Sequence, residues 1–235
     1  MEEKKCMLAY LSKSKGIGGK FKSSPDSFAV EEIMPDGRVL ELDKRIERED
    51  EESKGEFTHF VLQKRAWSTL DALRAIGRAV GCSIKRFSHA GLKDRQARTT
   101  QLASAWKIEP GRLLALSIKD IGINGAWKAG NKVKMGSLKG NRFTMHVEEV
   151  ESEAGERVKS IVGELRSEVP NYFGEQRFGI RNNSQVVGEH LVRGEFEAAV
   201  KEYLIGAGGK EHADARKARR RLDEEGDYAE ALEYF

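Results

Sequence analysis

Three stretches of the chain have apolar and polar patterns that favour β-strands, and the first of them alternates. Ser27 to Ile33 places Phe28 and Val30 two residues apart, and Gly55 to Lys64 is rich in aromatic and aliphatic residues. A further strand is expected from Thr99 to Trp106, which begins with β-branched residues. We expect all three stretches to contribute strands to a sheet.

A fourth expected strand carries Asn141, Phe143, Met145 and Val147 at alternate positions. Because alternate side chains of a strand point to the same face, these four should project together. We expect Asn141 and Phe143 to lie beside each other at one end of a buried row.

Helical spacing of apolar residues appears between and after these strands. Ser68 is placed to cap a helix whose apolar positions recur until Gly81. Another helix is expected across Val158 to Val169, and one more across Val187 to Leu204. The polar stretch 211–235 favours one or two helical turns. Strands and helices interleave without regular parallel units, which predicts an α+β fold with a mixed, largely antiparallel sheet flanked by helices.

Charge is nearly balanced over the 235 residues, with 41 Lys and Arg against 38 Asp and Glu and a net charge of +3. Nucleic-acid binding would therefore need locally segregated charge. Cations cluster at Lys13 to Lys22, Lys85 to Arg98, Lys128 to Arg142 and Lys217 to Arg221. Each cluster has ordinary solvated surface as its alternative, which we favour for the last one.

No spacing in the chain indicates a metal, a disulfide framework or a membrane span. Cys6 and Cys82 are far apart in the sequence and lack the close spacing of a cysteine motif. The five His residues form no metal-binding pattern. No apolar run approaches the length of a membrane span. We therefore expect a cytoplasmic, monomeric protein. It should need no cofactor or metal and should bind neither a membrane nor a protein partner.

The stretch from His89 to Gln101 concentrates candidate chemistry. It sets one carboxylate, Asp94, among the cationic or potentially cationic His89, Lys93, Arg95 and Arg98. A lone acid in a basic setting suits a site that binds anions while the carboxylate reacts. The alternative is a charged surface loop that leads into a strand.

The order of residues in this stretch resembles a family signature. The TruD family of tRNA pseudouridine synthases carries Gly-x-Lys-Asp-x-x-Ala-x-Thr-x-Gln, and residues 91–101 fill every fixed position. Three more stretches resemble further family elements, in the same chain order. They are Lys22 to Phe28, Lys139 to Phe143 and Asn171 to Gly179.

The resemblance implies an isomerase that converts a uridine within tRNA to pseudouridine. The family substrate is the uridine at position thirteen, in the D arm, and a buried target base must first be flipped into the pocket. Asp94 would be the family's essential aspartate, acting as nucleophile or as base. Residues 1–168 would form the first part of the pseudouridine synthase catalytic domain, and 169–235 the start of an inserted α/β domain.

The resemblance also assigns roles to other residues. Lys22 would lie beside the aspartate, Phe143 would stack on the target uracil, and Asn141 would bind the uracil edge or the Asp94 loop. Their alternatives are an exposed lysine, a core phenylalanine and a turn asparagine. RNA contacts are expected from five residues of the basic clusters that contain or flank the family's elements: Lys93, Arg95, Arg98, Lys139 and Arg142. Arg177, within the Asn171 to Gly179 element, is expected to reach RNA as well.

The chain departs from the family pattern in two ways. Asp26-Ser27 stands where the family usually has Glu-Asp, and the chain stops at Phe235, where family members continue for well over a hundred residues. A catalytically incomplete RNA-binding fragment is therefore the alternative function. A carboxylate glycosidase is disfavoured, since the chain offers no convincing second catalytic acid.

Overall fold

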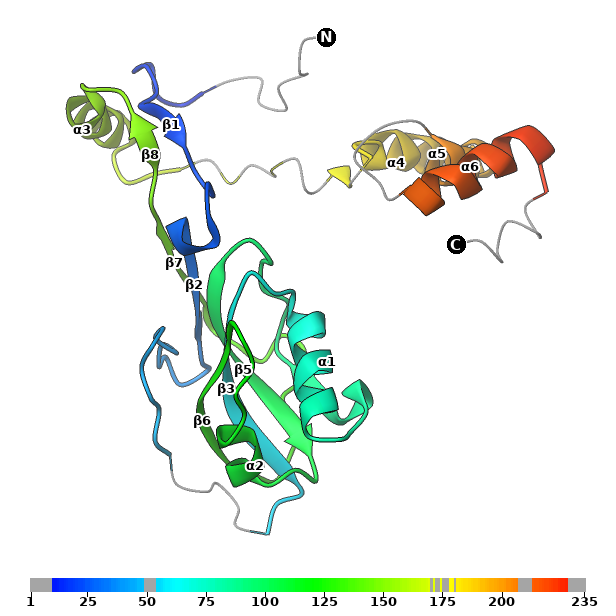
Figure 1. The fold of residues 1–235 in the computed structure, drawn as a ribbon. Coiled ribbons are helices and arrows are strands. Elements are labelled where there is room, and N and C mark those ends of the chain that lie inside the picture. The colour runs from blue at the N-terminus through cyan, green and yellow to red at the C-terminus, as the bar shows by residue number, and fades with distance from the viewer. Residues whose placement is uncertain are drawn as a thin grey trace. The chain divides into compact units, whose positions relative to one another are not determined.

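The computed structural model describes residues 10–48, 54–169, 171, 174, 178–179, 181–206 and 213–227. These residues fall into two compact units, one of residues 16–157 and one that joins residues before 16 to residues after 157 (Figure 1). Each unit is described by itself below. The division at residue 168 stays a prediction.

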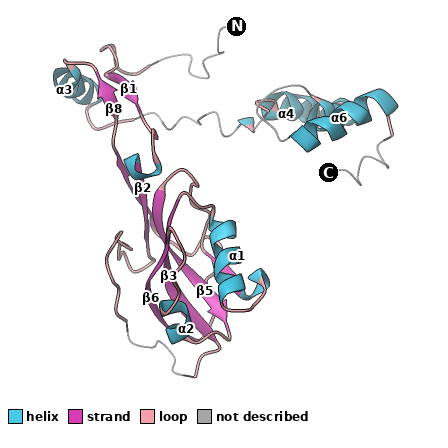
Figure 2. Cartoon of the chain, viewed as in Figure 1, coloured by secondary structure: helices cyan, strands magenta, loops and turns pink. Residues whose placement is uncertain are grey.

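A six-stranded sheet forms the centre of the 16–157 unit. Its strands are β2 (Phe28–Ile33), β3 (Phe57–Arg65), β4 (Phe87–His89), β5 (Arg98–Trp106), β6 (Ile121–Ala129) and β7 (Gly140–Met145). The strand order is β6-β3-β5-β2-β7, and β4 also pairs with β5. Only the β2–β5 pair is parallel. The expected α+β fold with a mixed, largely antiparallel sheet is confirmed (Figure 2).

Short helices and a small second ladder complete this unit. The helical elements are η1 (Pro25–Ser27), α1 (Thr69–Ala79), η2 (Ile84–Arg86) and α2 (Pro110–Leu114), and β1 (Gly18–Lys20) pairs with β8 (Glu148–Val150). The cap of α1 forms as predicted, since the Ser68 side chain accepts a hydrogen bond from the Asp71 amide. Gly81 follows the helix with a φ of 68°, which glycine adopts without strain.

The main core lies between α1 and the central strands. Leu73 and Ile76 of α1 are almost fully buried in one cluster with Phe60 and Leu62 of β3. Burial of each such side chain stabilises the fold by roughly 1.5–3 kcal/mol. This cluster supports β3 and β5 from one side. β5 follows the loop that carries Asp94, and Lys64 of β3 contacts that loop.

The expected buried row on β7 is wrong. Phe143, Met145 and Val147 are 53%, 56% and 42% exposed, and the strand ends at Met145. Among the described strands β7 pairs with β2 alone, which makes it an edge strand of this sheet. Alternation identifies the residues that share a face, but it does not show whether another layer covers that face.

Further helices follow β8 along the described chain. They are α3 (Ala154–Leu165), α4 (Ser184–Arg193), α5 (Phe196–Ile205) and α6 (Ala213–Glu225). Val187 to Leu204 forms two helices instead of the expected one, because Gly194 ends α4 with a φ of 77°. The polar stretch contains a 13-residue helix, longer than the expected one or two turns. No helix within the described ranges is both long and apolar enough to cross a membrane.

Candidate active site

Buried side chains hold the main chain of the loop between β4 and β5. The side-chain amide of Gln101 donates through Nε2 to the main-chain carbonyl of Gly91 at 3.0 Å. The Thr69 hydroxyl donates to Gln101 Oε1 at 2.9 Å and accepts from the Lys93 amide at 3.0 Å. The conformation of the segment that carries Asp94 is therefore set by the start of α1 and by β5.

Lys93 anchors the same loop through its side chain. Its Nζ lies 2.5 Å from Glu32 Oε2, and the two side chains are only 4% and 1% exposed. Glu32 Oε1 accepts a further hydrogen bond from the Leu102 amide at 3.0 Å. The Lys93 ammonium thus faces the protein interior and is not placed to contact RNA as expected from the sequence.

Lys64 of β3 supports the loop from beneath. Its Nζ donates to the carbonyl oxygens of Trp67 and Asp94, both at 2.8 Å, and lies 3.4 Å from that of Lys93. Burial lowers the pKa of Lys64 to about 8. The nearby Asp94 opposes this shift, and Lys93 adds to it.

The Asp94 carboxylate faces solvent above this buried support. Its Oδ2 lies 3.4 Å from Lys22 Nζ, with the side chains of Asp94 and Lys22 46% and 29% exposed. A pair as exposed as this contributes at most about 1 kcal/mol to stability. The expected neighbourhood of Lys22 and Asp94 is therefore present, and it leaves the acid open to an approaching molecule.

Two aromatic rings, the buried Phe28 and the exposed Phe143, continue from this ion pair. Lys22 Nζ lies 4.0 Å from the centroid of the Phe28 ring. The Phe28 and Phe143 centroids are 6.0 Å apart, with the rings tilted by 32°. Phe143 is 53% exposed, so it is not the core phenylalanine of the alternative reading. Phe28 joins Phe143 to the Lys22–Asp94 pair.

Asn141 lies on the sheet beside these rings. It is the register partner of Glu32, as Phe143 is of Val30, so the four side chains share one face of the β2–β7 pair. Asn141 Oδ1 is buried and accepts no hydrogen bond from the described residues. Asn141 thus lies across the strand pair from Glu32, whose carboxylate pairs with Lys93 of the Asp94 loop.

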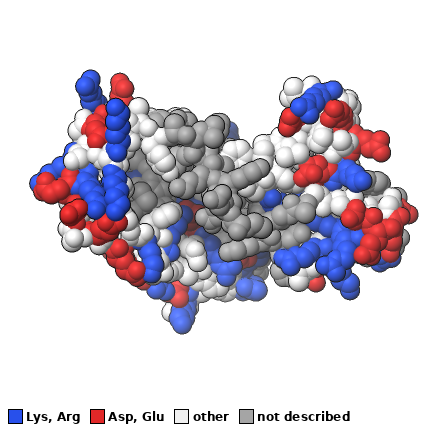
Figure 3. Space-filling model, turned by 90° about the horizontal axis from the view of Figure 1, so that it is seen from above, with Lys and Arg blue, Asp and Glu red and all other residues white. Residues whose placement is uncertain are grey.

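Two of the predicted RNA-binding arginines are paired with acids. Arg98 lies 2.5 Å from Asp43, and Arg142 lies 2.7 Å from Glu31. Figure 3 likewise shows basic and acidic side chains interspersed over the face that it presents. The segregation of charge expected from the sequence is thus weakened locally by ion pairs.

The other predicted RNA-binding residues differ in their setting. Arg95 and Lys139 are exposed. Arg177 lies outside the described residues. Burial lowers the pKa of His89, which favours its neutral form over the cation considered from the sequence.

Two residues of this site were not found from the sequence. Lys64 could have been suspected, because it shares its strand parity with Phe60 and Leu62 and so points toward the core. Phe28 lies within a family element, but its spacing alone indicated only a strand residue. Its contact with Phe143 depends on the β2–β7 register, which local sequence does not reveal.

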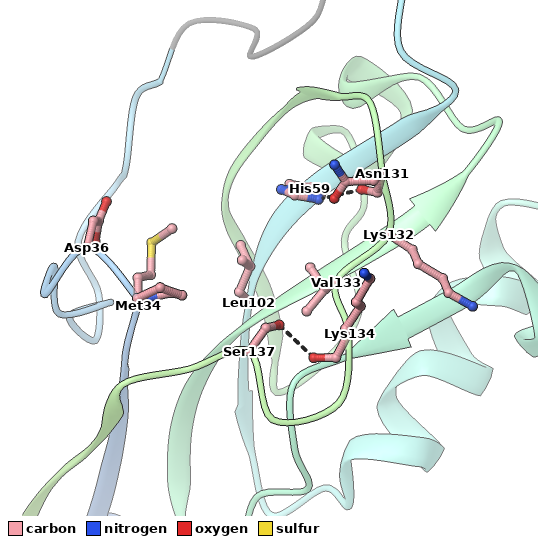
Figure 4. A pocket seen from close by; sticks show the side chains of 10 residues that line it. Met34, Asp36, His59, Leu102, Asn131, Lys132, Val133, Lys134 and Ser137 are labelled. Atoms are coloured by element: carbon pink, nitrogen blue, oxygen red, sulfur yellow. Dashed lines mark hydrogen bonds between the residues drawn. The ribbon is translucent and has the colours of Figure 1, made fainter.

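A separate cavity of about 380 Å³ lies at the other end of β2. Its walls come from Met34, His59, Leu102 and the 131–137 segment (Figure 4). None of the predicted site residues that the structure describes lines this cavity. Within the described ranges, no group of three or more His, Cys, Asp or Glu residues could hold a metal ion.

Comparisons with known proteins agree with the fold and the motifs. The family model of TruD, tRNA pseudouridine synthase D, matches residues 6–235. A probable tRNA pseudouridine synthase D from Methanococcus vannielii is 39% identical over 228 residues, covering 96% of this chain and 58% of that protein. The tRNA pseudouridine synthase D of Geobacter sulfurreducens is 35% identical over 224 residues, covering 94% and 51%.

A solved structure shares the architecture. A crystal structure assigned to tRNA pseudouridine synthase D (TruD) of Methanosarcina mazei superposes with a TM-score of 0.69 at 29% identity, covering 97% of this chain and 50% of that chain. The chain spans about half the length of the relatives that it matches. It belongs to the tRNA pseudouridine synthase D (TruD) family.

Proposed function

We propose that this chain carries the catalytic aspartate of a tRNA pseudouridine synthase, which isomerises a uridine in tRNA. The observation that carries the proposal is the half-exposed Asp94 carboxylate, set 3.4 Å from Lys22, which in turn lies beside two adjoining aromatic rings. We further propose that residues 1–168 are the first part of the catalytic domain and 169–235 the start of the family's inserted domain. The reaction would take place on tRNA in the cytoplasm.

Asp94 is the reacting group in this proposal. The N1–C1′ bond of the uridine breaks, C5 of the turned uracil bonds to C1′, and the proton on C5 is released. A carboxylate can serve either as a nucleophile at the ribose or as a base that removes a ribose proton. Lys22 would keep the carboxylate in place and contact a substrate phosphate.

The neighbouring surface would hold the flipped base. Phe143 offers an exposed ring, and stacking on an aromatic face tolerates a base in either orientation. Stacking is worth roughly 1–3 kcal/mol for each base. Asn141 has both a donor and an acceptor and would bind either the uracil edge or the Asp94 loop.

The substrate in this proposal is the uridine at position thirteen of the D arm. Extrusion of a stacked base costs a few kcal/mol, which contacts with the tRNA backbone must offset. Arg95 and Lys139 are exposed and suited to phosphates. Arg98 and Arg142 would have to exchange their carboxylate partners for phosphate, and Arg177 completes the proposed contacts.

The experiment is tritium release from tRNA labelled at C5 of uridine, because formation of the C5–C1′ bond expels the label. This chain and a longer protein that contains it are compared, and the modified position is mapped in the product. Release from the D-arm uridine by the longer protein supports the proposal. Absence of release by that protein from any tRNA contradicts it.

A catalytically incomplete RNA-binding fragment is the second candidate for the chain by itself. The observation that favours it is the coverage of only about half of each relative. Binding of tRNA by the isolated chain without release, alongside release by the longer protein, would assign this role to the chain. Release by the chain itself would exclude it.

A further inference from the structure

Lys64 carries a buried ammonium whose contacts are all with main-chain oxygens. The residue is 1% exposed. Its Nζ contacts the carbonyl oxygens of Trp67, Asp94 and Lys93 at 2.8, 2.8 and 3.4 Å. A lysine ammonium has three N–H donors and no acceptor, so its protonated form matches these three oxygens.

The strand face that carries Lys64 also carries buried apolar side chains. Lys64 lies on the strand face of Phe60 and Leu62, where an apolar side chain of similar length could pack. No carboxylate within the described residues lies in ion-pair distance of Lys64 Nζ. Burying a charge without a counter-ion costs free energy. The role of the Lys64 ammonium should therefore be sought at the carbonyl groups that it contacts.

We propose that Lys64 is a positioning residue for the reaction, because its ammonium fixes the main chain at residues 93 and 94 and thereby places the Asp94 carboxylate. The inference rests on the proposed function of Asp94. Lys64 acts only through the main chain and does not touch the substrate. A displacement of about 1 Å in a reacting group can cost roughly a hundredfold in rate.

Protonation of Lys64 gives this role a pH signature. The charges that act on its ammonium are Asp94, which raises its pKa, and Lys93, which lowers it, while burial dominates and brings the pKa to about 8. Lys93 forms an ion pair with Glu32. The charges of Lys93 and Glu32 also affect the pKa of His89. Above about pH 8 the ammonium loses one of its three donors. Turnover should therefore fall as pH rises through this value.

Stability should change in the opposite direction over the same range. The pKa of Lys64 is lower in the folded protein than its ordinary value of 10.5. Between these two values the unfolded chain binds more protons than the folded one, so this group makes the fold more stable as pH rises. A fall in turnover without a fall in stability distinguishes positioning from a structural role.

The test substitutes Lys64→Met and uses Lys119→Met, an exposed lysine of the same unit, as the matched control. Hydrogen exchange of peptides spanning residues 91–97 is measured first, since it requires no turnover. Lys64→Met should speed exchange there, and Lys119→Met should not. In the protein form that releases tritium, Lys64→Met should lower kcat at least tenfold, leave KM within about twofold and abolish the fall near pH 8.

Lys64→Arg, which keeps a charge that does not titrate in this range, should move the alkaline fall away from pH 8. Unchanged exchange at residues 91–97 in Lys64→Met, or an unchanged pH profile, overturns the proposal. If Lys64→Met does not fold, the parent protein provides the test. A kcat that stays constant above pH 8 overturns the proposal. A kcat that falls above pH 8 while stability is undiminished supports it. Faster exchange in a protein that modifies no RNA would retain the positioning role and reject the proposed function.

Discussion

Asp94, the proposed reacting group, and the side chains beneath it differ sharply in exposure. The Asp94 side chain is 46% exposed, whereas Lys93 and Lys64 beneath it are almost fully buried. Since the support donates mainly to main-chain carbonyl groups, the carboxylate itself stays open to a substrate. Covalent or general-base chemistry needs a carboxylate that the substrate can reach and that the surrounding residues hold in place.

The buried Lys93–Glu32 pair should be important for stability. Lys93→Met leaves the Glu32 carboxylate buried without its partner, so the free energy of unfolding should fall by about 3–5 kcal/mol. Adding Glu32→Gln removes that charge while keeping an acceptor for the Leu102 amide, and it should recover part of the loss. Urea unfolding of the two single variants and the double variant measures the coupling.

The exposed pair Lys44–Glu41 is the matched control. Its atoms are 2.6 Å apart, but the side chains are 68% and 36% exposed. Lys44→Met should therefore cost no more than about 1 kcal/mol. Equal losses from Lys93→Met and Lys44→Met would show that burial of the first pair has no energetic consequence.

Phe143 should contribute to turnover more than to stability. Its ring is 53% exposed, so Phe143→Ala should change the free energy of unfolding by less than about 1 kcal/mol. Loss of base stacking should lower kcat/KM by roughly 5- to 150-fold, the equivalent of 1–3 kcal/mol. Tritium release and urea unfolding of the same variant provide the two numbers.

Met145 provides the comparison for Phe143. It lies two residues further along β7 on the same face and is 56% exposed, but it has no flat ring. Met145→Ala should leave kcat/KM within about threefold of the parent. A loss as large as that of Phe143→Ala would mean that apolar area, and not stacking, is what the substrate needs.

Motif order nominated Asp94, Lys22 and Phe143 as site residues, because each lies in a short stretch that resembles a family element, and their roles stay predictions. The setting of Lys93 could not be read in this way, since composition does not show which cation of a basic stretch turns inward. Lys64 was missed because its partners are main-chain atoms of residues 67, 93 and 94, which only the folded loop brings together.

Among the elements, β6 shows how closely a neighbouring segment can approach a strand. Asn124 lies at an irregularity of the β3–β6 register, and its carbonyl accepts from the Ile46 amide at 2.7 Å. A Cβ added at Gly125 would lie 2.2 Å from the Ile46 carbonyl oxygen. Glycine is therefore required where the segment around Ile46 crosses this edge strand.

Gly125→Ala should destabilise the fold by roughly 1–3 kcal/mol, because the segment around Ile46 must move away. Gly111 in α2 is the control, since an added Cβ there meets nothing within 4 Å. Gly111→Ala should be neutral or slightly stabilising, as alanine favours a helix by about 0.5–1 kcal/mol. Thermal unfolding compares the two, and a neutral Gly125→Ala would contradict the close approach.

Strands and helices followed their sequence patterns where local signals were sufficient. β2, β3 and β5 begin and end close to the predicted residues, and α1 has its predicted cap. The β7 row failed because exposure depends on a covering layer. The break between α4 and α5 was missed because apolar residues recur on both sides of Gly194, whose left-handed conformation separates the helices.

Apolar burial is distributed unevenly between the two units. Within the described ranges, the buried hydrophobic residues outside 16–157 are Ala199, Ala218 and Leu222. Phe196 and Tyr203 of α5 are 67% and 62% exposed. The helices α4 to α6 therefore have little core of their own.

This difference predicts stepwise opening of the chain. Amides of α4, α5 and α6 should exchange with deuterium well before those of β3 and β5, because local stability follows buried apolar contact. Hydrogen exchange followed by mass spectrometry at neutral pH measures both sets in one sample. Simultaneous exchange of the two units would show that they unfold as one cooperative body.

The most direct measurement concerns Asp94. Tritium release and tRNA binding should be measured together for Asp94→Asn in the protein form that releases tritium, with the exposed Asp36→Asn as control. Asp94→Asn should lower release by roughly 10²–10⁴-fold while the Kd for tRNA stays within about threefold. Release by Asp94→Asn that equals release by the Asp36→Asn control would contradict a chemical role for this carboxylate.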